Sequence, residues 1–176
     1  MTLRVLDPTQ LAQGEALRLA PPLAALDGAV VGMIDNAKIG TERLFDFIEE
    51  ILKQEYHVRE CIRRRKPDAS RPVPPQMLME MRGADAILAA TGDCGSGSSC
   101  SLHDAIEAER LGIPAVAIMT DRFVATARAV AGVNGLKDYP FAVIAHPIAN
   151  NDDRVLREKA RIAVDAIVPM LMRRQG

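Results

Sequence analysis

From Gly28 onward, short apolar runs alternate with segments in which apolar residues recur every three or four positions. Short runs rich in β-branched residues predict strands, and the three-to-four spacing predicts helices with one buried face. Five strands are expected, over Ala29–Ile34, His57–Ile62, Ala84–Ala90, Pro114–Met119 and Phe141–Ala145. The second run is more polar than the others, which favours a place at the edge of a sheet.

Helical segments lie between these strands. The first begins at Thr41 as its N-cap, and its apolar face consists of Leu44, Phe45, Ile48, Ile51 and Leu52. Further helices are expected over Gln76–Met81, Ser101–Leu111, Arg122–Ala131 and Asp152–Met172. Gly112 is typical of a helix C-terminus, and Asn151 or Asp152 is expected to cap the last helix.

Strands that alternate with helices predict an α/β fold, a three-layer sandwich with a five-stranded parallel sheet in the flavodoxin-like order 2-1-3-4-5. We expect residues 28–176 to form this single domain. Residues 1–27, interrupted by Pro8, Pro21 and Pro22, are expected to form an N-terminal arm on the domain or on a partner subunit. Right-handed crossovers place the C-terminal ends of all strands at one rim, where such sheets bind ligands.

Composition narrows the choice of partners. The 176-residue chain has a net charge of −1 and 3% aromatic residues, which argues against nucleic acid as a partner. No apolar run reaches the roughly 18 residues that a membrane span needs, and the N-terminus lacks a signal-peptide pattern. We therefore expect a cytoplasmic protein that binds a small-molecule substrate and forms a homo-oligomer, without nucleic acid or membrane as a partner.

The segment from Asp93 to Cys100 is the most informative part of the sequence, because it follows a buried strand and precedes a helix. A helix N-terminus carries partial positive charge and unpaired N–H groups, which lower the pKa of a cysteine thiol and bind anions. Cys94 is therefore predicted to react as a thiolate nucleophile. The surrounding glycines and serines are expected to contact a substrate through backbone N–H groups and hydroxyls. A buried, inert Cys94 is the structural alternative.

Three other side chains are candidates for catalysis. Cys100 either resolves an oxidised Cys94 or faces the core, and the sequence leaves both open. His103 either moves protons or hydrogen-bonds within its own helix. His146 follows the fifth strand and precedes Pro147, which favours a function at the rim. Cys61 is expected to pack against its neighbours and to have no chemical role.

Basic residues at the rim suggest an anionic substrate. Lys38, and one or two members of the run Arg63–Lys66, are expected to bind a carboxylate or phosphate. The predicted substrate-binding set consists of Asn36, Lys38, Asp93, Gly95, Ser96, Gly97, Ser98 and Asp121. Cys94, Cys100 and His103 lack the paired spacing typical of zinc, so neither a metal nor a cofactor is expected.

These motifs together resemble the UGSC-type selenoprotein-like family, named for a Sec/Cys-Gly-Ser-Cys motif. The matching stretches are Gly92-Asp93-Cys94-Gly95-Ser96, Ser101-Leu102-His103-Asp104-Ala105, Gly112-Ile113-Pro114, Thr120-Asp121-Arg122-Phe123 and His146-Pro147. The resemblance runs from about Leu19 to the C-terminus. It implies a nucleophilic sulfur at Cys94 and a relation to segments of the glycine and proline reductase subunits.

One position departs from that motif, because its final cysteine is Gly97 in this chain. The resemblance implies thiol-based reductive chemistry, with Cys100 as the replacement for the missing thiol. Hydrolase, lyase or isomerase chemistry without a disulfide cycle is the alternative that Gly97 favours. A non-catalytic anion-binding subunit of a larger complex is the third function class.

Overall fold

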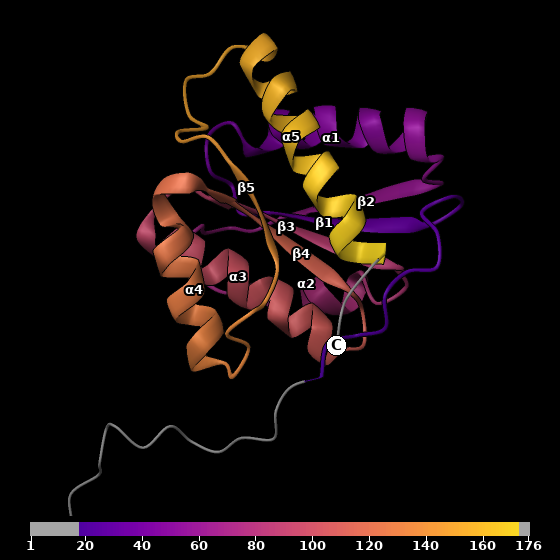
Figure 1. The fold of residues 1–176 in the computed structure, drawn as a ribbon, viewed down its shortest axis with the longest axis horizontal. Helices are drawn as coiled ribbons and strands as arrows, with labels where there is room; N and C mark the ends of the chain where they lie inside the picture. The colour runs from indigo at the N-terminus through magenta and orange to yellow at the C-terminus, as the bar shows by residue number, and fades with distance from the viewer. Residues whose placement is uncertain (1–17, 173–176) are drawn as a thin grey trace, which may run out of the picture.

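The computed structural model describes residues 18–172, and its centre is one parallel β-sheet (Figure 1). The strands are β1 (Val30–Asp35), β2 (Glu60–Arg65), β3 (Ala86–Gly92), β4 (Ala115–Thr120) and β5 (Phe141–Ile144). Their order in the sheet is β2-β1-β3-β4-β5, and every neighbouring pair is parallel. The predicted α/β fold and flavodoxin-like strand order are therefore confirmed.

Helices cover both faces of the sheet, as Figure 1 shows. They are α1 (Thr41–Tyr56), α2 (Pro75–Glu80), α3 (Gly95–Arg110), α4 (Val124–Val133) and α5 (Asp153–Met172), with a 3₁₀ turn η1 (Asp121–Phe123) before α4. Helices α1 and α5 share one apolar core with Met33 and Ile118. Helices α2, α3 and α4 share another with Ile87 and Met119 on the opposite face.

The largest departures from the predicted boundaries are at β2 and α3. Strand β2 begins at Glu60 and includes Arg63–Arg65, whereas the prediction ended it at Ile62. As an edge strand it is half-buried or exposed throughout, so its hydrophobic pattern does not mark its ends. Helix α3 begins at Gly95, six residues earlier than expected, so most of the glycine- and serine-rich segment is helical.

Helix α1 begins differently from the prediction. Its N-cap is Gly40, with φ at 94°, and Thr41 is the first helical residue. A Cβ atom on Gly40 would lie 2.6 Å from the carbonyl oxygen of Ile148, so only glycine permits this contact between the β1–α1 and β5–α5 loops. The expected cap of α5 is confirmed, because the Asp152 carboxylate accepts the amide of Val155 at 2.8 Å.

The described part of the predicted N-terminal arm, residues 18–27, contacts the domain itself. The amide of Ala20 donates to the Glu109 carboxylate at 2.7 Å, and that of Leu23 donates to the carbonyl of Leu171 at 2.9 Å. Leu26 is buried in the core shared by α1 and α5. Residues 1–17 lie outside the described part of the chain.

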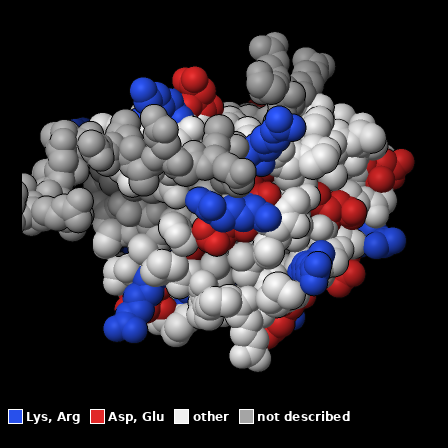
Figure 2. All heavy atoms as spheres, turned by 90° about the horizontal axis from the view of Figure 1, so that it is seen from below, with Lys and Arg blue, Asp and Glu red and all other residues white. Residues whose placement is uncertain are grey.

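Charged side chains of both signs are interspersed on the face drawn in Figure 2, with uncharged surface between them. Over residues 18–172, no helix combines the length and the apolar character needed to cross a membrane.

Candidate active site

Cys94 lies at the C-terminal rim of the sheet, just after the end of strand β3. The strand ends at Gly92, and Cys94 is the extended N-cap residue of α3, whose carbonyl accepts the amide of Ser98 at 2.9 Å. A Cβ atom on Gly92 would lie 2.1 Å from the Met119 sulfur and 2.8 Å from Ser98 Oγ. The missing side chain therefore lets α3 pack against the sheet directly after the strand.

The Cys94 side chain is half-buried beside the first turn of α3. Its Sγ lies 4.0 Å from Ser96 Oγ and 2.9 Å from the point that a Cβ atom on Gly97 would occupy. The first amides of an α-helix have no acceptor inside the helix and carry partial positive charge. This 16-residue helix thus places hydrogen-bond donors beside the sulfur.

Asp93, which precedes the cysteine, holds His146 on the same rim. Its buried carboxylate Oδ1 lies 2.8 Å from His146 Nδ1 and also accepts the amide of Ile148 at 3.3 Å. Thr120 Oγ1 lies 3.2 Å from the same nitrogen and gives its own proton to the carbonyl of Gly92.

These contacts assign the proton on the imidazole ring. The Asp93 carboxylate and Thr120 Oγ1 are both acceptors toward Nδ1, so Nδ1 carries the hydrogen. The neutral ring then has its lone pair on Nε2, and 31% of the side chain is exposed. His146 is thus arranged as a base, oriented by a carboxylate in the manner of catalytic histidines.

Three further residues fix the position of His146. Asp121 accepts the backbone amide of His146 at 3.2 Å, and the Phe123 ring lies 5.7 Å from the imidazole centroid. Lys159, which is 6% exposed, donates to the carbonyl of Pro147 and to Asn151 Oδ1 at 2.8 Å. Burial lowers the pKa of Lys159, while Asp93 and Asp121 act in the opposite direction.

Lys38 is the cation of the rim. Its Nζ lies 4.0 Å from Asp93 Oδ2, and 29% of its side chain is exposed. The β1–α1 loop that carries Lys38 contacts the β5–α5 loop at Gly40, so the cation, the carboxylate and the imidazole share one site.

The amino-acid sequence matches one protein-family model. The model of the UGSC family matches residues 4–173, nearly the whole chain. The chain belongs to the UGSC family. No curated protein matches it in sequence.

In this UGSC family protein, Asn36 organises the rim and has no hydrogen-bonding capacity left for a substrate. Its Nδ2 donates to the carbonyl of Thr91 and to Ser101 Oγ, at 2.8 and 3.1 Å. Its Oδ1 accepts from Lys38 N and Thr41 Oγ1. With the side chain 1% exposed, the predicted substrate contact is corrected to a structural role.

The other predicted binding residues divide into two groups. Gly95 and Ser96 are exposed beside Cys94, where their backbone can meet a ligand. Gly97 and Ser98 are buried, and Ser98 Oγ faces Gly92 without a hydrogen-bond partner. Neither residue therefore presents a side chain to a substrate from outside. Asp93 and Asp121 both contact His146, through Nδ1 and through the backbone amide respectively.

The early start of α3 separates Cys100 and His103 from Cys94. Six helical residues span about 9 Å, beyond the roughly 7 Å that a disulfide allows between α-carbons, so the helix must unwind before Cys100 can resolve Cys94. Burial also raises the pKa of Cys100. His103 lies in the third turn, about 13 Å along the axis, where its Nε2 is 3.8 Å from Glu107.

The basic run Arg63–Lys66, at the end of β2 and directly after it, offers no unpaired cation. Arg63 binds Asp46 and Glu49, Arg64 binds Glu80, and Arg65 binds Glu42. Lys66 is buried against Asp104 at 2.6 Å. A small cavity of about 160 Å³ beside these residues is lined by Asp35, Glu42, Phe45, Arg63, Arg64 and Arg65. The ion pairs therefore occupy the cations of this run that were expected to bind an anion, whereas Lys38, outside the run, lies beside Asp93 on the rim.

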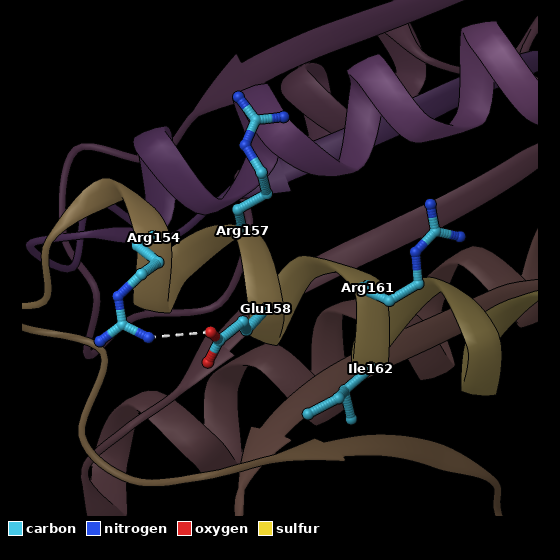
Figure 3. Close-up of a pocket in the computed structure, with 5 residues that line it drawn as sticks. All are labelled: Arg154, Arg157, Glu158, Arg161 and Ile162. Atoms are coloured by element: carbon cyan, nitrogen blue, oxygen red, sulfur yellow. Dashed lines mark hydrogen bonds and ion pairs between the residues drawn. The ribbon is translucent and has the colours of Figure 1, made fainter.

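A second hollow lies on the outer face of α5 (Figure 3). Arg157 and Arg161 point toward α1, where they bind Glu50 and Glu55, and Arg154 binds Glu158. These pairs neutralise the arginines, and none of the lining residues belongs to the predicted site. Within residues 18–172, no three metal-ligating side chains gather.

The sequence reasoning missed Lys159 and Ser101, although both leave a signal in the sequence. Lys159 occupies a core-facing position of α5 between Leu156 and Ala160, where a lysine is unexpected unless its ammonium has partners. Ser101 lies in the Ser-x-His-Asp stretch that carries the resemblance, and its Oγ accepts a hydrogen bond from Asn36 Nδ2.

Proposed function

We propose that this protein is a cysteine-dependent enzyme in which Cys94 attacks a small, polar, anionic substrate. One observation carries the proposal: Asp93, the residue before the nucleophile, contacts Nδ1 of His146, a side chain that is 31% exposed on the same rim. A nucleophile, an oriented base, helix N–H donors and a nearby ammonium are the parts that covalent catalysis requires.

Acyl transfer illustrates how these parts act. His146 Nε2 takes the thiol proton, and the Cys94 sulfur bonds to the carbonyl carbon, whose π electrons move to oxygen. The N–H groups at the start of α3 stabilise this oxyanion. The leaving group departs with the proton from His146 as the C=O bond re-forms. Water, deprotonated by the same imidazole, then cleaves the thioester and restores the thiol.

Hydrolase, lyase or isomerase chemistry, which needs no disulfide cycle, has the stronger geometric support. Gly97 supplies no thiol, and Cys100 lies nearly two helical turns from Cys94. Thiol-based reduction is the second candidate, favoured by the resemblance and by a Cys94 side chain that is only half-buried. It requires an external thiol: Cys94 and this thiol together give two electrons and two protons to the substrate and are left joined as a disulfide. A second external thiol then releases Cys94 by forming a disulfide with the first.

Substitution of His146 by glutamine is expected to slow deacylation of Cys94 about a hundredfold or more, because a general base contributes about 10² to 10⁴ in rate. The probe is p-nitrophenyl acetate. Its burst of nitrophenolate reports acylation, and mass spectrometry follows loss of the acetyl group. His103→Gln is the matched control and should turn over at the wild-type rate. Equal deacylation in His146→Gln and wild type would exclude His146 as the base.

Substitution of Lys38 by methionine is expected to lower the alkylation rate of Cys94 by iodoacetate relative to iodoacetamide. The ratio should fall about fivefold, since two unit charges 4 Å apart in water interact by about 1 kcal/mol. Lys53→Met makes the same charge change on α1, where Lys53 binds Glu49, and should leave the ratio unchanged. An equal fall in both variants would mean that Lys38 does not recruit the anion.

A further inference from the structure

The buried ion pair between Lys66 and Asp104 is not used by the proposed mechanism. The two side chains are 1% and 0% exposed, and the ammonium lies 2.6 Å from Asp104 Oδ2. Desolvation offsets most of the Coulomb attraction in such a pair, so its contribution to the free energy of folding does not explain its presence. Its position in the fold suggests another role.

Asp104 binds both ends of the loop that joins β2 to α2. Lys66 directly follows β2, and Val73, which precedes α2, donates its backbone amide to Asp104 Oδ1 at 2.7 Å. Between them, the 67–72 loop is ordered by Asp68, whose carboxylate accepts the amide and the hydroxyl of Ser70. One carboxylate on α3 therefore determines where this loop lies.

The middle of the 67–72 loop and the reactive sulfur lie beside the same residue, Gly97. The carbonyl oxygen of Ala69 lies 3.9 Å from the point that a Cβ atom on Gly97 would occupy, and Cys94 Sγ lies 2.9 Å from that same point. The Cys94 sulfur and the loop backbone at a small residue therefore both line the space beside Gly97, at the start of α3.

We propose that the Lys66–Asp104 pair fixes the 67–72 loop beside Cys94, so that the loop limits the size of the molecules that react with the thiol. Lys66 and Asp104 are positioning residues, and Ala69 determines specificity. This inference rests on the proposed function only in treating Cys94 as the site of reaction.

The experiment compares two reagents with the same reactive group, iodoacetamide and N-phenyliodoacetamide, and maps the modified cysteine by mass spectrometry. Removal of one charge of the pair would leave the other buried and unpaired, so both are replaced, in Lys66→Met with Asp104→Leu. The phenyl-to-parent ratio is the rate at which Cys94 reacts with N-phenyliodoacetamide divided by its rate with iodoacetamide. This ratio should rise about tenfold, because steric overlap between the phenyl group and the fixed loop backbone is relieved. Arg71→Ala, an exposed change in the same loop, should leave the ratio unchanged.

A second variant tests the loop with the ion pair intact. In Ala69→Leu, a larger side chain on the half-buried loop residue whose carbonyl lies beside Gly97 should lower the phenyl-to-parent ratio about fivefold or more. A wild-type ratio in this variant, or in a folded Lys66→Met/Asp104→Leu protein, would overturn the proposal. Slow reaction of wild-type Cys94 with both reagents would instead contradict the proposed function, while the change in ratio between variants would still decide the role of the loop.

Discussion

Substitution of Cys94 by serine is expected to abolish the fast alkylation of this protein and any covalent turnover. The change preserves the size of the side chain and the start of α3, so the fold should be retained. A free cysteine thiol has a pKa of about 8.5, whereas a serine hydroxyl ionises far less readily. At neutral pH the serine oxygen offers almost no anionic nucleophile, and the rate of a covalent step should fall by orders of magnitude.

The other cysteines provide the internal comparison in this experiment. Burial raises the pKa of Cys61 to about 11 and also raises the pKa of Cys100 above its ordinary range. Because the thiolate is the reacting form, both should react slowly near neutral pH and gain reactivity only as the pH rises toward these values. Alkylation near neutral pH should therefore map to Cys94.

The measurement is iodoacetamide labelling against pH for wild type, Cys94→Ser and Cys61→Ala, with circular dichroism as the check on folding. Cys61→Ala should keep the fast phase and Cys94→Ser should lose it. Three cysteines that react slowly and alike in the wild-type protein would make Cys94 a structural residue and support the anion-binding subunit instead.

The sheet could be predicted from the sequence because each buried strand is a short apolar run bounded by polar or glycine residues. The parallel order then predicted that Asp93, Cys94 and His146 lie on one rim, since residues after parallel strands share an edge. The contact between Asp93 and His146 was not predictable, because it depends on the conformation of two loops that are distant in sequence.

The errors have physical causes in particular residues. Glycine and serine are weak helix formers, so the segment after Cys94 was predicted to be a loop. Tertiary packing of Ser98 and of the side-chain-free Gly92 against Met119 overrides this preference and starts α3 at Gly95. Because α3 starts six residues earlier than predicted, Cys100 and His103 lie further along the helix, away from the Cys94 thiol. Asn36 was assigned to the substrate because its type suggested binding, whereas its four hydrogen bonds are made within the protein.

Substitution of Gly97 by cysteine is expected to create a disulfide with Cys94 and to block alkylation of Cys94 almost completely after mild oxidation. The two residues are the N-cap and the third residue of α3, and helical geometry places their α-carbons about 5 Å apart, within the disulfide range. In a disulfide, the sulfur–sulfur bond of about 2.05 Å brings each Cβ within about 3 Å of the other sulfur. A Cβ atom on residue 97 would already lie 2.9 Å from Cys94 Sγ.

The Gly97→Cys variant thus restores the thiol that the resemblance places at this position, without requiring α3 to unwind. Dithiothreitol should return the Cys94 alkylation rate to that of reduced protein, and peptide mapping should show a disulfide between Cys94 and the thiol introduced at position 97. Gly95→Cys is the matched control, because a Cβ atom there has no neighbour within 4 Å. If the two variants oxidise alike, the Cys94 sulfur does not point toward residue 97. The argument that Cys94 and Cys100 are too far apart for a disulfide in the natural protein would then have to be withdrawn.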